Sequence, residues 1–171
     1  LRVLPASGFA VLDADSPHFG FLRRQTAARL VTVSLAGAES DYRVSDPDEV
    51  AGAFTLTERA TGVSRSLRAV LPGRHQILNL ALAVAAARAC EVSWEQIAGA
   101  LPRLPRPPMR WEEVRIGEVV VINDAYNASP PAMEAALRLF ARQAAGRRRV
   151  LVLGEMRELG AGAGEAHAAV G

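Results

Sequence analysis

The sequence predicts an α/β protein, because short β-branched apolar runs alternate with helical stretches along its 171 residues. Three observations support this prediction. The first half is rich in strand patterns that end in turn residues. A proline-rich segment then interrupts the chain, and strand and helix patterns alternate after it. Half of the residues are hydrophobic, which excludes a disordered chain.

The first part of the chain is expected to be mainly β. The apolar run at residues 9–12 predicts a strand, and a short helix is expected at residues 17–24. A second buried strand is predicted at residues 30–35. Turn signals then separate three further strands with antiparallel pairing, at residues 42–44, 53–58 and 63–70.

Two helices are predicted before the proline-rich segment. Residues 77–89 are apolar on nearly every side of a helix, so we expect this helix to be deeply buried. Ser93 opens the second helix, and Gln96 three residues later completes a capping box. That helix should stop at Pro102, because proline cannot continue it.

A domain boundary is predicted at residues 103–109, where three closely spaced prolines stiffen the chain. We place residues 1–104 in one domain and residues 105–171 in the next. After the boundary, strands are expected at residues 111–116, 119–122 and 149–153, and helices at 130–144 and 162–170. This order predicts a parallel doubly wound sheet, which about 60 residues are too few to complete.

Charge and composition exclude several classes of protein. The net charge of +2 is too small for a nucleic-acid groove, and all 20 basic residues are arginines. No apolar run of roughly 18 residues occurs, so no membrane insertion is expected. The single cysteine, Cys90, cannot form an internal disulfide and is expected to be a small buried residue in a helix. These features fit a cytoplasmic protein.

The first candidate site lies where a glycine loop leads into a helix. His75, Gln76 and Asn79 fall on or just before the first turn of that helix. The side-chain amides of Gln76 and Asn79 offer the donors and acceptors that match an adenine edge. The alternative is a helix start whose polar side chains cap free backbone amides.

The second and third candidates flank the boundary. Arg110 lies at the junction with the next strand, where its guanidinium can reach phosphates; the alternative is an ion pair with Glu112 or Glu113. Asp124 follows a strand predicted to be buried, and ligands of α/β sheets bind at such strand ends. This carboxylate can accept both hydroxyls of a ribose, with Tyr126 beside it. The alternative is an Asx turn that caps a helix.

The remaining polar groups carry less information. His167 follows a second run of polar residues at 154–160, and a surface or helix-capping histidine is the simpler interpretation. No group of Cys and His has metal-ligand spacing, so no metal site is predicted within this chain.

These motifs, in this order, resemble the Mur ligase family. Residues 73–79 are similar to its G-x-H-N-x-x-N helix start, and Arg110 to its linker arginine. Residues 124–130 resemble D-S-Y-N-A-N-P, residues 153–160 resemble L-G-D-M-x-E-L-G, and residues 11–17 resemble V-L-N-A-D-D-P. These three patterns are those of the family member that adds D-alanyl-D-alanine to the cell-wall precursor.

The resemblance implies a fold and an activity. It identifies the first domain as part of a P-loop-type ATP-binding domain with a β-rich segment. The second would be an incomplete Rossmann-like ligase domain. The parent would be a cytoplasmic ligase of peptidoglycan synthesis, cell-wall biogenesis, cell shape and cell division. ATP would phosphorylate the carboxylate of a UDP-N-acetylmuramoyl-tripeptide, and the amine of D-alanyl-D-alanine would displace the phosphate.

The resemblance also implies an ATP-binding role for His75, Gln76 and Asn79, with Gln76 and Asn79 near the adenine. Gln76 stands where the family has asparagine. The ligands of Mg²⁺, the phosphate loop and the carbamylated lysine of the family are expected upstream of this chain, which is therefore expected to be inactive alone.

In the second domain, the resemblance implies that Asp124 holds the ribose and that Arg110 contacts the phosphates as a catalytic residue. Tyr126 and Asn127 would line the nucleotide or dipeptide side. Two alternatives stay open. One is a folylpolyglutamate-synthase-like ligase, and the other is a non-catalytic α/β module that binds a nucleotide or a protein partner.

Overall fold

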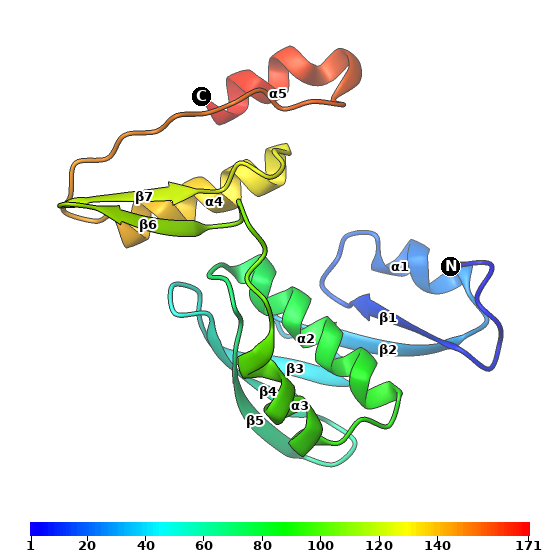
Figure 1. Cartoon of the computed structure of the whole chain (residues 1–171). Coiled ribbons are helices and arrows are strands. Elements are labelled where there is room, and N and C mark those ends of the chain that lie inside the picture. Colours follow the sequence, from blue (N-terminus) through cyan, green and yellow to red (C-terminus); the bar gives the residue numbers. More distant parts are fainter.

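The structure, a computed structural model, describes all 171 residues and contains two units joined by an exposed linker (Figure 1). The N-terminal unit (residues 1–103) is built on a sheet in the order β1-β2-β3-β4-β5. Neighbours among β1, β2 and β3 are parallel, whereas β4 is antiparallel to both β3 and β5. The strands are β1 (Phe9–Asp13), β2 (Arg29–Ser34), β3 (Tyr42–Asp48), β4 (Ala53–Glu58) and β5 (Val63–Arg68).

The helices of this unit follow the predicted order. The short α1 (Phe19–Leu22) and a 3-10 turn, η1 (Arg23–Gln25), connect β1 to β2, while α2 (Arg74–Ala89) and α3 (Trp94–Ala100) lie against the sheet (Figure 1). Ser93 and Gln96 form the predicted capping box. A second 3-10 turn, η2 (Leu101–Arg103), ends the unit. The predicted strands and helices before the linker are thus confirmed, and α2 begins earlier than expected.

The expectation that α2 is deeply buried is wrong. Only one stripe of the helix is buried against β1, β2 and β3, formed by Ile77, Ala81, Val84 and Ala85. A single sheet can cover only one side of a helix, so the remaining small apolar side chains stay partly exposed. Cys90, just after the helix, is exposed rather than buried.

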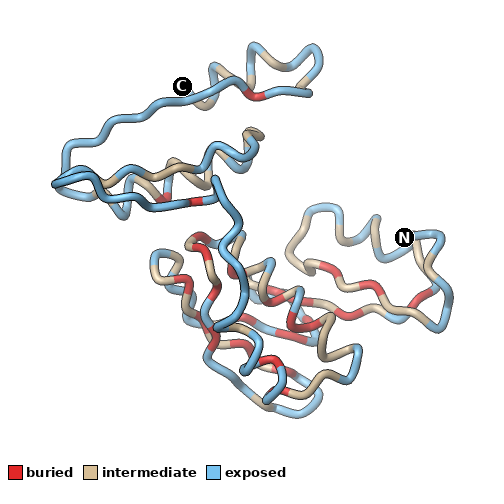
Figure 2. The backbone as a smooth tube through the Cα atoms, viewed as in Figure 1, coloured by how far each residue is buried: buried red, intermediate tan, exposed pale blue.

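The main hydrophobic core belongs to the N-terminal unit (Figure 2). It joins β2 to β5 with α2 and α3, and its fully buried members include Val33, Leu56 and Ile77. The C-terminal unit contributes no residue to this core. Its own buried hydrophobic side chains are Trp111, Leu139 and Met156.

The C-terminal unit (residues 109–171) differs from the predicted parallel sheet. Strands β6 (Glu112–Ile116) and β7 (Val119–Asn123) form an antiparallel hairpin. Helix α4 (Pro130–Gln143), a 3-10 turn η3 (Gly160–Gly162) and α5 (Ala163–Val170) follow (Figure 1). Residues 149–153, predicted as a strand, belong to no helix or strand.

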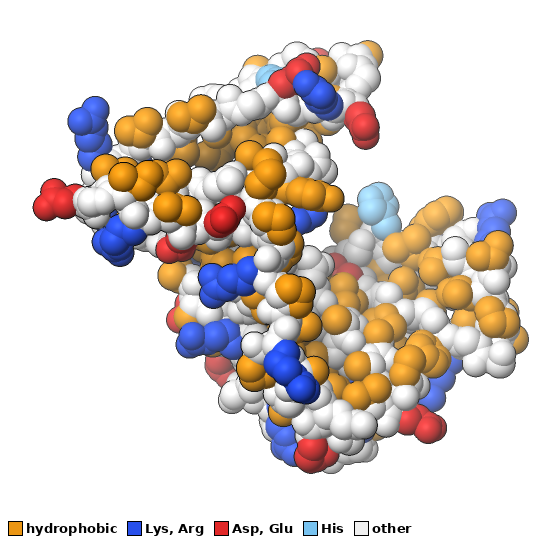
Figure 3. Space-filling view, viewed as in Figure 1, with side chains coloured by type: hydrophobic (Ala, Val, Ile, Leu, Met, Phe, Trp, Pro, Cys, Tyr) orange, Lys and Arg blue, Asp and Glu red, His pale blue; other side chains and the backbone are white.

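The absence of a partner strand explains this difference. Residues 149–153 run as an extended segment away from the hairpin (Figure 1), and Val152 is 94% exposed. A strand needs a neighbour for its backbone hydrogen bonds, and here the segment has none. The expectation that β7 is a buried strand is also wrong: β7 pairs with β6, but Val119 and Val121 are exposed. Figure 3 shows hydrophobic side chains gathered on the surface over this hairpin.

No helix of the structure combines the length and the apolar character that crossing a membrane requires.

A buried carboxylate connects α2 and α3 to the sheet. Glu58, 8% exposed at the end of β4, accepts hydrogen bonds from the Tyr42 hydroxyl (2.8 Å), Thr61 (3.0 Å) and the Trp94 indole (3.3 Å). Arg88 of α2 pairs with it at 3.4 Å. Burial raises the pKa of Glu58, but these donors and the positive charge outweigh burial and hold the pKa below its ordinary value.

We expect Glu58→Gln to destabilise the chain by about 1–3 kcal/mol, because an amide turns a donor toward groups that themselves donate. The matched control is Glu39→Gln, whose exposed ion pair with Arg59 should contribute less than about 1 kcal/mol. Urea unfolding at pH 7 gives both values. A loss for Glu58→Gln no larger than that of the control would contradict this role.

The same pair of variants gives a pH dependence. The folded-state pKa of Glu58 lies below the ordinary 4.5, so its stabilisation is present above that pH. It is lost as the pH falls through the lowered pKa. The difference in unfolding free energy between the wild type and Glu58→Gln should therefore shrink below pH 4.5. A difference that stays constant down to acid unfolding would show that the charge of Glu58 is not what stabilises the fold.

Candidate functional site

The two units meet at the start of α2, beside the carboxyl end of β3. The backbone N–H of Gly73 donates to the carbonyl of Glu49, just after β3, at 2.7 Å. From the other unit, Leu139 of α4 is only 2% exposed, and Arg142 forms an ion pair with Glu49. A cleft lies between the units, lined by Glu49, Gly73, Arg74, His75, Ala135, Arg138, Leu139, Ala141 and Arg142.

Gly73 allows the approach of these parts. Its φ of 110° and ψ of 146° suit glycine, and a Cβ there would lie 2.9 Å from Cε1 of His75. The same Cβ would lie 3.6 Å from Leu139 of the other unit. No side chain caps α2, so the alternative that its polar residues are helix caps is wrong.

His75 lies within the electrostatic reach of both units. Partial desolvation by the surrounding atoms lowers the pKa of His75 although the residue stays exposed, and the charge of Arg110 acts in the same direction. The carboxylates of Asp124 and Glu49 oppose this shift without reversing it. The lowered pKa favours the neutral ring, which can both donate and accept a hydrogen bond.

Arg110 lies in a tight turn at residues 109–111, which we call the linker turn. The guanidinium carbon of Arg110 is 4.2 Å from the ring centroid of Tyr126, a cation–π contact. Met109 and Trp111 on either side have left-handed backbones, with φ of 57° and 46°. Such strain costs about 1–3 kcal/mol per residue and persists only where surrounding contacts impose it.

Asp124 holds this turn in place. Its Oδ1 accepts a hydrogen bond from the backbone N–H of Trp111 at 3.0 Å, while the carboxylate as a whole remains exposed. One oxygen thus fixes the linker and the other is free to accept from a ligand. The Asx turn that the sequence left open is formed by the preceding residue, since Asn123 accepts from the amide of Ala125 at 3.3 Å.

The alternative ion pair of Arg110 with Glu112 or Glu113 is not formed. Glu112 accepts from the backbone N–H of Met109 at 3.2 Å, and Glu113 accepts from the Gln143 amide at 2.6 Å. Arg110 is therefore free to meet an anion in front of Tyr126.

The structure therefore brings together only some of the predicted site residues. The four that share the junction, by contact or by charge, are His75, Arg110, Asp124 and Tyr126. Gln76 and Asn79 lie further along α2, and neither side chain makes a hydrogen bond. Asn127 accepts only from the amide of Ala128, at 2.9 Å, and makes no side-chain contact with the group.

Sequence reasoning missed several residues of this junction. Glu49 comes from a strand connection, Leu139 and Arg142 come from the C-terminal half of α4, and no local motif marks them. Gln143 was also missed, although its amide bonds to the indole of Trp111 at 3.2 Å. A tryptophan directly after the linker arginine is the one signal that a specific packing site was needed there.

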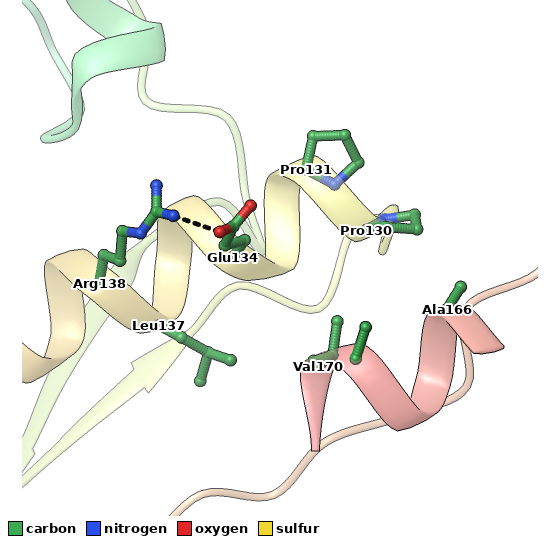
Figure 4. A pocket seen from close by; sticks show the side chains of 8 residues that line it. Pro130, Pro131, Glu134, Leu137, Arg138, Ala166 and Val170 are labelled. Carbon is green, nitrogen blue, oxygen red and sulfur yellow. Dashed lines mark hydrogen bonds and ion pairs between the residues drawn. The ribbon is translucent and has the colours of Figure 1, made fainter.

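A second cleft lies between α4 and α5 and lacks this chemistry (Figure 4). Its only charged lining residues, Glu134 and Arg138, pair with each other. His167 of α5 accepts from the Met156 amide at 3.0 Å through Nε2, and its Nδ1 lies 2.7 Å from the Ala163 carbonyl. That is the structural role that the sequence favoured for His167.

The chain is similar to known ligases along nearly its whole length. Residues 109–171 match the family described as Mur ligase, glutamate ligase domain. The chain is 37% identical to a UDP-N-acetylmuramoyl-tripeptide–D-alanyl-D-alanine ligase of Mycobacterium tuberculosis, over 99% of the chain and 34% of that protein. The corresponding Escherichia coli ligase is 29% identical over 98% of the chain and 37% of that protein.

Solved structures show the same fold. MurF from Acinetobacter baumannii superposes with a TM-score of 0.84 at 24% identity, over 98% of this chain and 36% of that one. MurF from Thermotoga maritima, solved in complex with ADP, superposes with a TM-score of 0.70 at 21% identity, over 96% and 37%. Residues 109–171 belong to the Mur ligase family, and the chain as a whole is similar to ligases of that family. It spans about a third of the length of the curated relatives it matches.

We expect Gly73→Ala to destabilise the chain by about 1–3 kcal/mol, because the new Cβ meets His75 and the backbone must leave its left-handed conformation. The matched control is Gly99→Ala in α3, where a Cβ meets no atom within 4 Å and helix propensity improves. Denaturant unfolding measures both. Equal stability of the two variants would show that the Gly73 conformation is not required.

Proposed function

We propose that this chain carries the adenosine side of the ATP site of a ligase that adds D-alanyl-D-alanine to a UDP-N-acetylmuramoyl-tripeptide. The observation that carries the proposal is the group of Arg110, Tyr126 and Asp124 around the linker turn, whose charged members act on His75 across the junction of the two units. Relatives of the whole chain bear the name of that ligase, which gives the reaction class.

The start of α2 would hold the adenine. His75 and Asn79 are four residues apart on this helix and share a face, with Gln76 beside them. All three side chains offer donors and acceptors, and neither amide is engaged within the protein. Because Gln76 stands where the family has asparagine, its contact with the base depends on the longer side chain reaching the same edge.

The C-terminal unit would hold the ribose and the phosphates. The free oxygen of Asp124 can accept from ribose hydroxyls, and the unpaired guanidinium of Arg110 offers a fork of donors to phosphate oxygens. Tyr126 keeps Arg110 in front of the site, and Asn127 would line its outer side. ATP would supply the phosphoryl group that activates the tripeptide carboxylate for attack by the dipeptide amine.

This proposal gives each unit a place in the family fold. Residues 1–104 would be the end of a P-loop-type central domain, and residues 105–171 the start of a Rossmann-like ligase domain. The mixed sheet, in which β1, β2 and β3 are parallel, supports the first assignment. The strand pattern at residues 149–153 supports the second, since it has the composition of a buried parallel strand.

The proposal also includes a metal ion, two substrates and a cellular setting. Mg²⁺ would be held by residues outside this chain, because no group of three or more His, Cys, Asp or Glu side chains here is placed to bind a metal. The partners are the two substrates, with no nucleic acid and no membrane insertion. The setting would be the cytoplasm, and the product would serve cell-wall synthesis, cell shape and cell division.

A folate-polyglutamating ligase is the closest rival. A folylpolyglutamate synthase from Thermotoga maritima superposes with a TM-score of only 0.52, over 71% of this chain. The pattern at Tyr126 and Asn127, which differs from the D-G-A-H-N-P expected of that rival, favours the cell-wall ligase. A non-catalytic module that binds a nucleotide or a protein partner would share the nucleotide contacts, and the activity of a longer form of the protein would separate it.

We expect Asp124→Asn to weaken ATP binding by about 10-fold, since a charged hydrogen bond contributes roughly 1.5–3 kcal/mol. Asparagine keeps an oxygen for the Trp111 amide, so the unfolding free energy should stay near that of the wild type. The matched control is Glu118→Gln on the exposed hairpin turn, where ATP binding should not change. Titration calorimetry measures the affinities; an unchanged affinity for Asp124→Asn would contradict the ribose assignment.

We also expect that the 171-residue chain alone does not catalyse ligation. Phosphoryl transfer depends on compact positive charges such as a phosphate-loop lysine and Mg²⁺, and this chain has no lysine. Arginine stays protonated, so it cannot be carbamylated either. The test is phosphate release by the purified chain with ATP, Mg²⁺, D-alanyl-D-alanine and the UDP-muramoyl-tripeptide. Turnover above a denatured control, after removal of any contaminating ligase, would contradict this expectation.

A further inference from the structure

The linker turn (residues 109–111) is fastened to the C-terminal unit alone. Its backbone bonds to the Tyr126 amide (3.1 Å), to Glu112 (3.2 Å) and to Asp124 (3.0 Å). Its Trp111 side chain bonds to Gln143 at 3.2 Å. Residues 104–108 before it are exposed and belong to no helix or strand. Any bending between the units is therefore expected at residues 104–108, while the linker turn moves with the C-terminal unit.

Gln143, the last residue of α4, is the anchor of this arrangement. Its Oε1 accepts from the indole N–H of Trp111, and its Nε2 donates to Oε1 of Glu113 on β6 at 2.6 Å. Both ends of the amide are thus used, so its orientation is fixed. Trp111 is 7% exposed, so its ring is packed in place as well as hydrogen-bonded.

The anchor acts on Arg110 through the backbone. Trp111 and Met109 keep left-handed conformations that a free chain would leave. If the indole were released, Trp111 would relax, and the direction of the Arg110 side chain would change with it. The 4.2 Å contact of Arg110 with Tyr126 depends on that direction.

We propose that Gln143 is a positioning residue of the ATP site: through Trp111 it holds Arg110 against Tyr126. Arg110, Tyr126 and Asp124 then approach the nucleotide as one rigid group. That the ligand is a nucleotide rests on the function proposed above, whereas the hold of Gln143 on Trp111 and Arg110 does not. The side chain of Gln143 makes its hydrogen bonds to Trp111 and Glu113, not to Arg110 or Asp124.

The chemistry of position 143 requires an amide. A glutamate there would keep an acceptor for the Trp111 indole but would place a second carboxylate against Glu113. A methionine would fill a similar volume and lose both hydrogen bonds. We therefore expect Gln143→Met to release Trp111 at every pH. Gln143→Glu should release it less, and least at acidic pH, where one of the two carboxyls is protonated.

Fluorescence tests whether Gln143 holds Trp111 in place. The chain has two tryptophans, so Trp94→Phe leaves Trp111 as the single reporter. In that background, Gln143→Met should shift the emission to longer wavelength and raise acrylamide quenching at least 2-fold. Glu134→Gln, on the same helix but paired only with Arg138, is the matched control. Circular dichroism confirms that each variant is folded. Unchanged emission and quenching in Gln143→Met would overturn the inference.

ATP titration tests the link to the site. With the fold intact, we expect Gln143→Met to weaken ATP binding by about 10-fold, because Arg110 no longer faces the phosphates. Gln143→Glu should recover part of the affinity as the pH is lowered. If the wild type binds ATP and Gln143→Met binds equally well although Trp111 is released, the positioning role is wrong. If the wild type itself does not bind ATP, the proposed function fails, and the fluorescence result alone decides the role of Gln143.

Discussion

The placement of α2 is the constraint on which the rest of the structure depends. The helix starts at Gly73, whose backbone N–H is held by the Glu49 carbonyl at the carboxyl end of β3. From there α2 crosses β3, β2 and β1 and supplies one side of the hydrophobic core. The same start brings His75 to the junction with α4. A β-carbon at Gly73 would disturb the helix start and the contact between the units together.

The division of labour between the two units follows from this placement. The N-terminal unit has its own core and the buried Glu58 cluster, and no residue of the other unit belongs to either. The C-terminal unit buries little, and the contacts that order it are polar ones around the linker turn. Candidate ligand-binding groups therefore lie at the edge of a rigid unit and on a turn fixed by hydrogen bonds, an arrangement suited to binding between two units.

Local sequence patterns predicted most of the N-terminal fold, because the element that each pattern favours is also the element that packs into the core there. The runs that became β1, β2 and β4 are apolar or alternating, and turn residues mark their ends. The Ser93–Gln96 capping box lies within four residues and needs no distant partner. The burial of α2 was overestimated, because its composition does not say whether one or two layers will cover it. Residues 149–153 have the composition of a strand, but strand formation depends on a neighbour elsewhere in the chain.

The sequence by itself determined the class of fold, the family and the residues that carry candidate chemistry, because glycine, proline and polar groups at helix and strand ends act within a few residues. It pointed to Arg110 and Asp124 but left open an ion pair for Arg110 and an Asx turn for Asp124. Only the tertiary structure decided between them, by placing Arg110 over Tyr126 and Asp124 on the linker turn. It also revealed Gln143, whose role arises from the meeting of α4, β6 and the linker. Such contacts join residues about thirty positions apart, and a pattern confined to neighbouring residues cannot predict them.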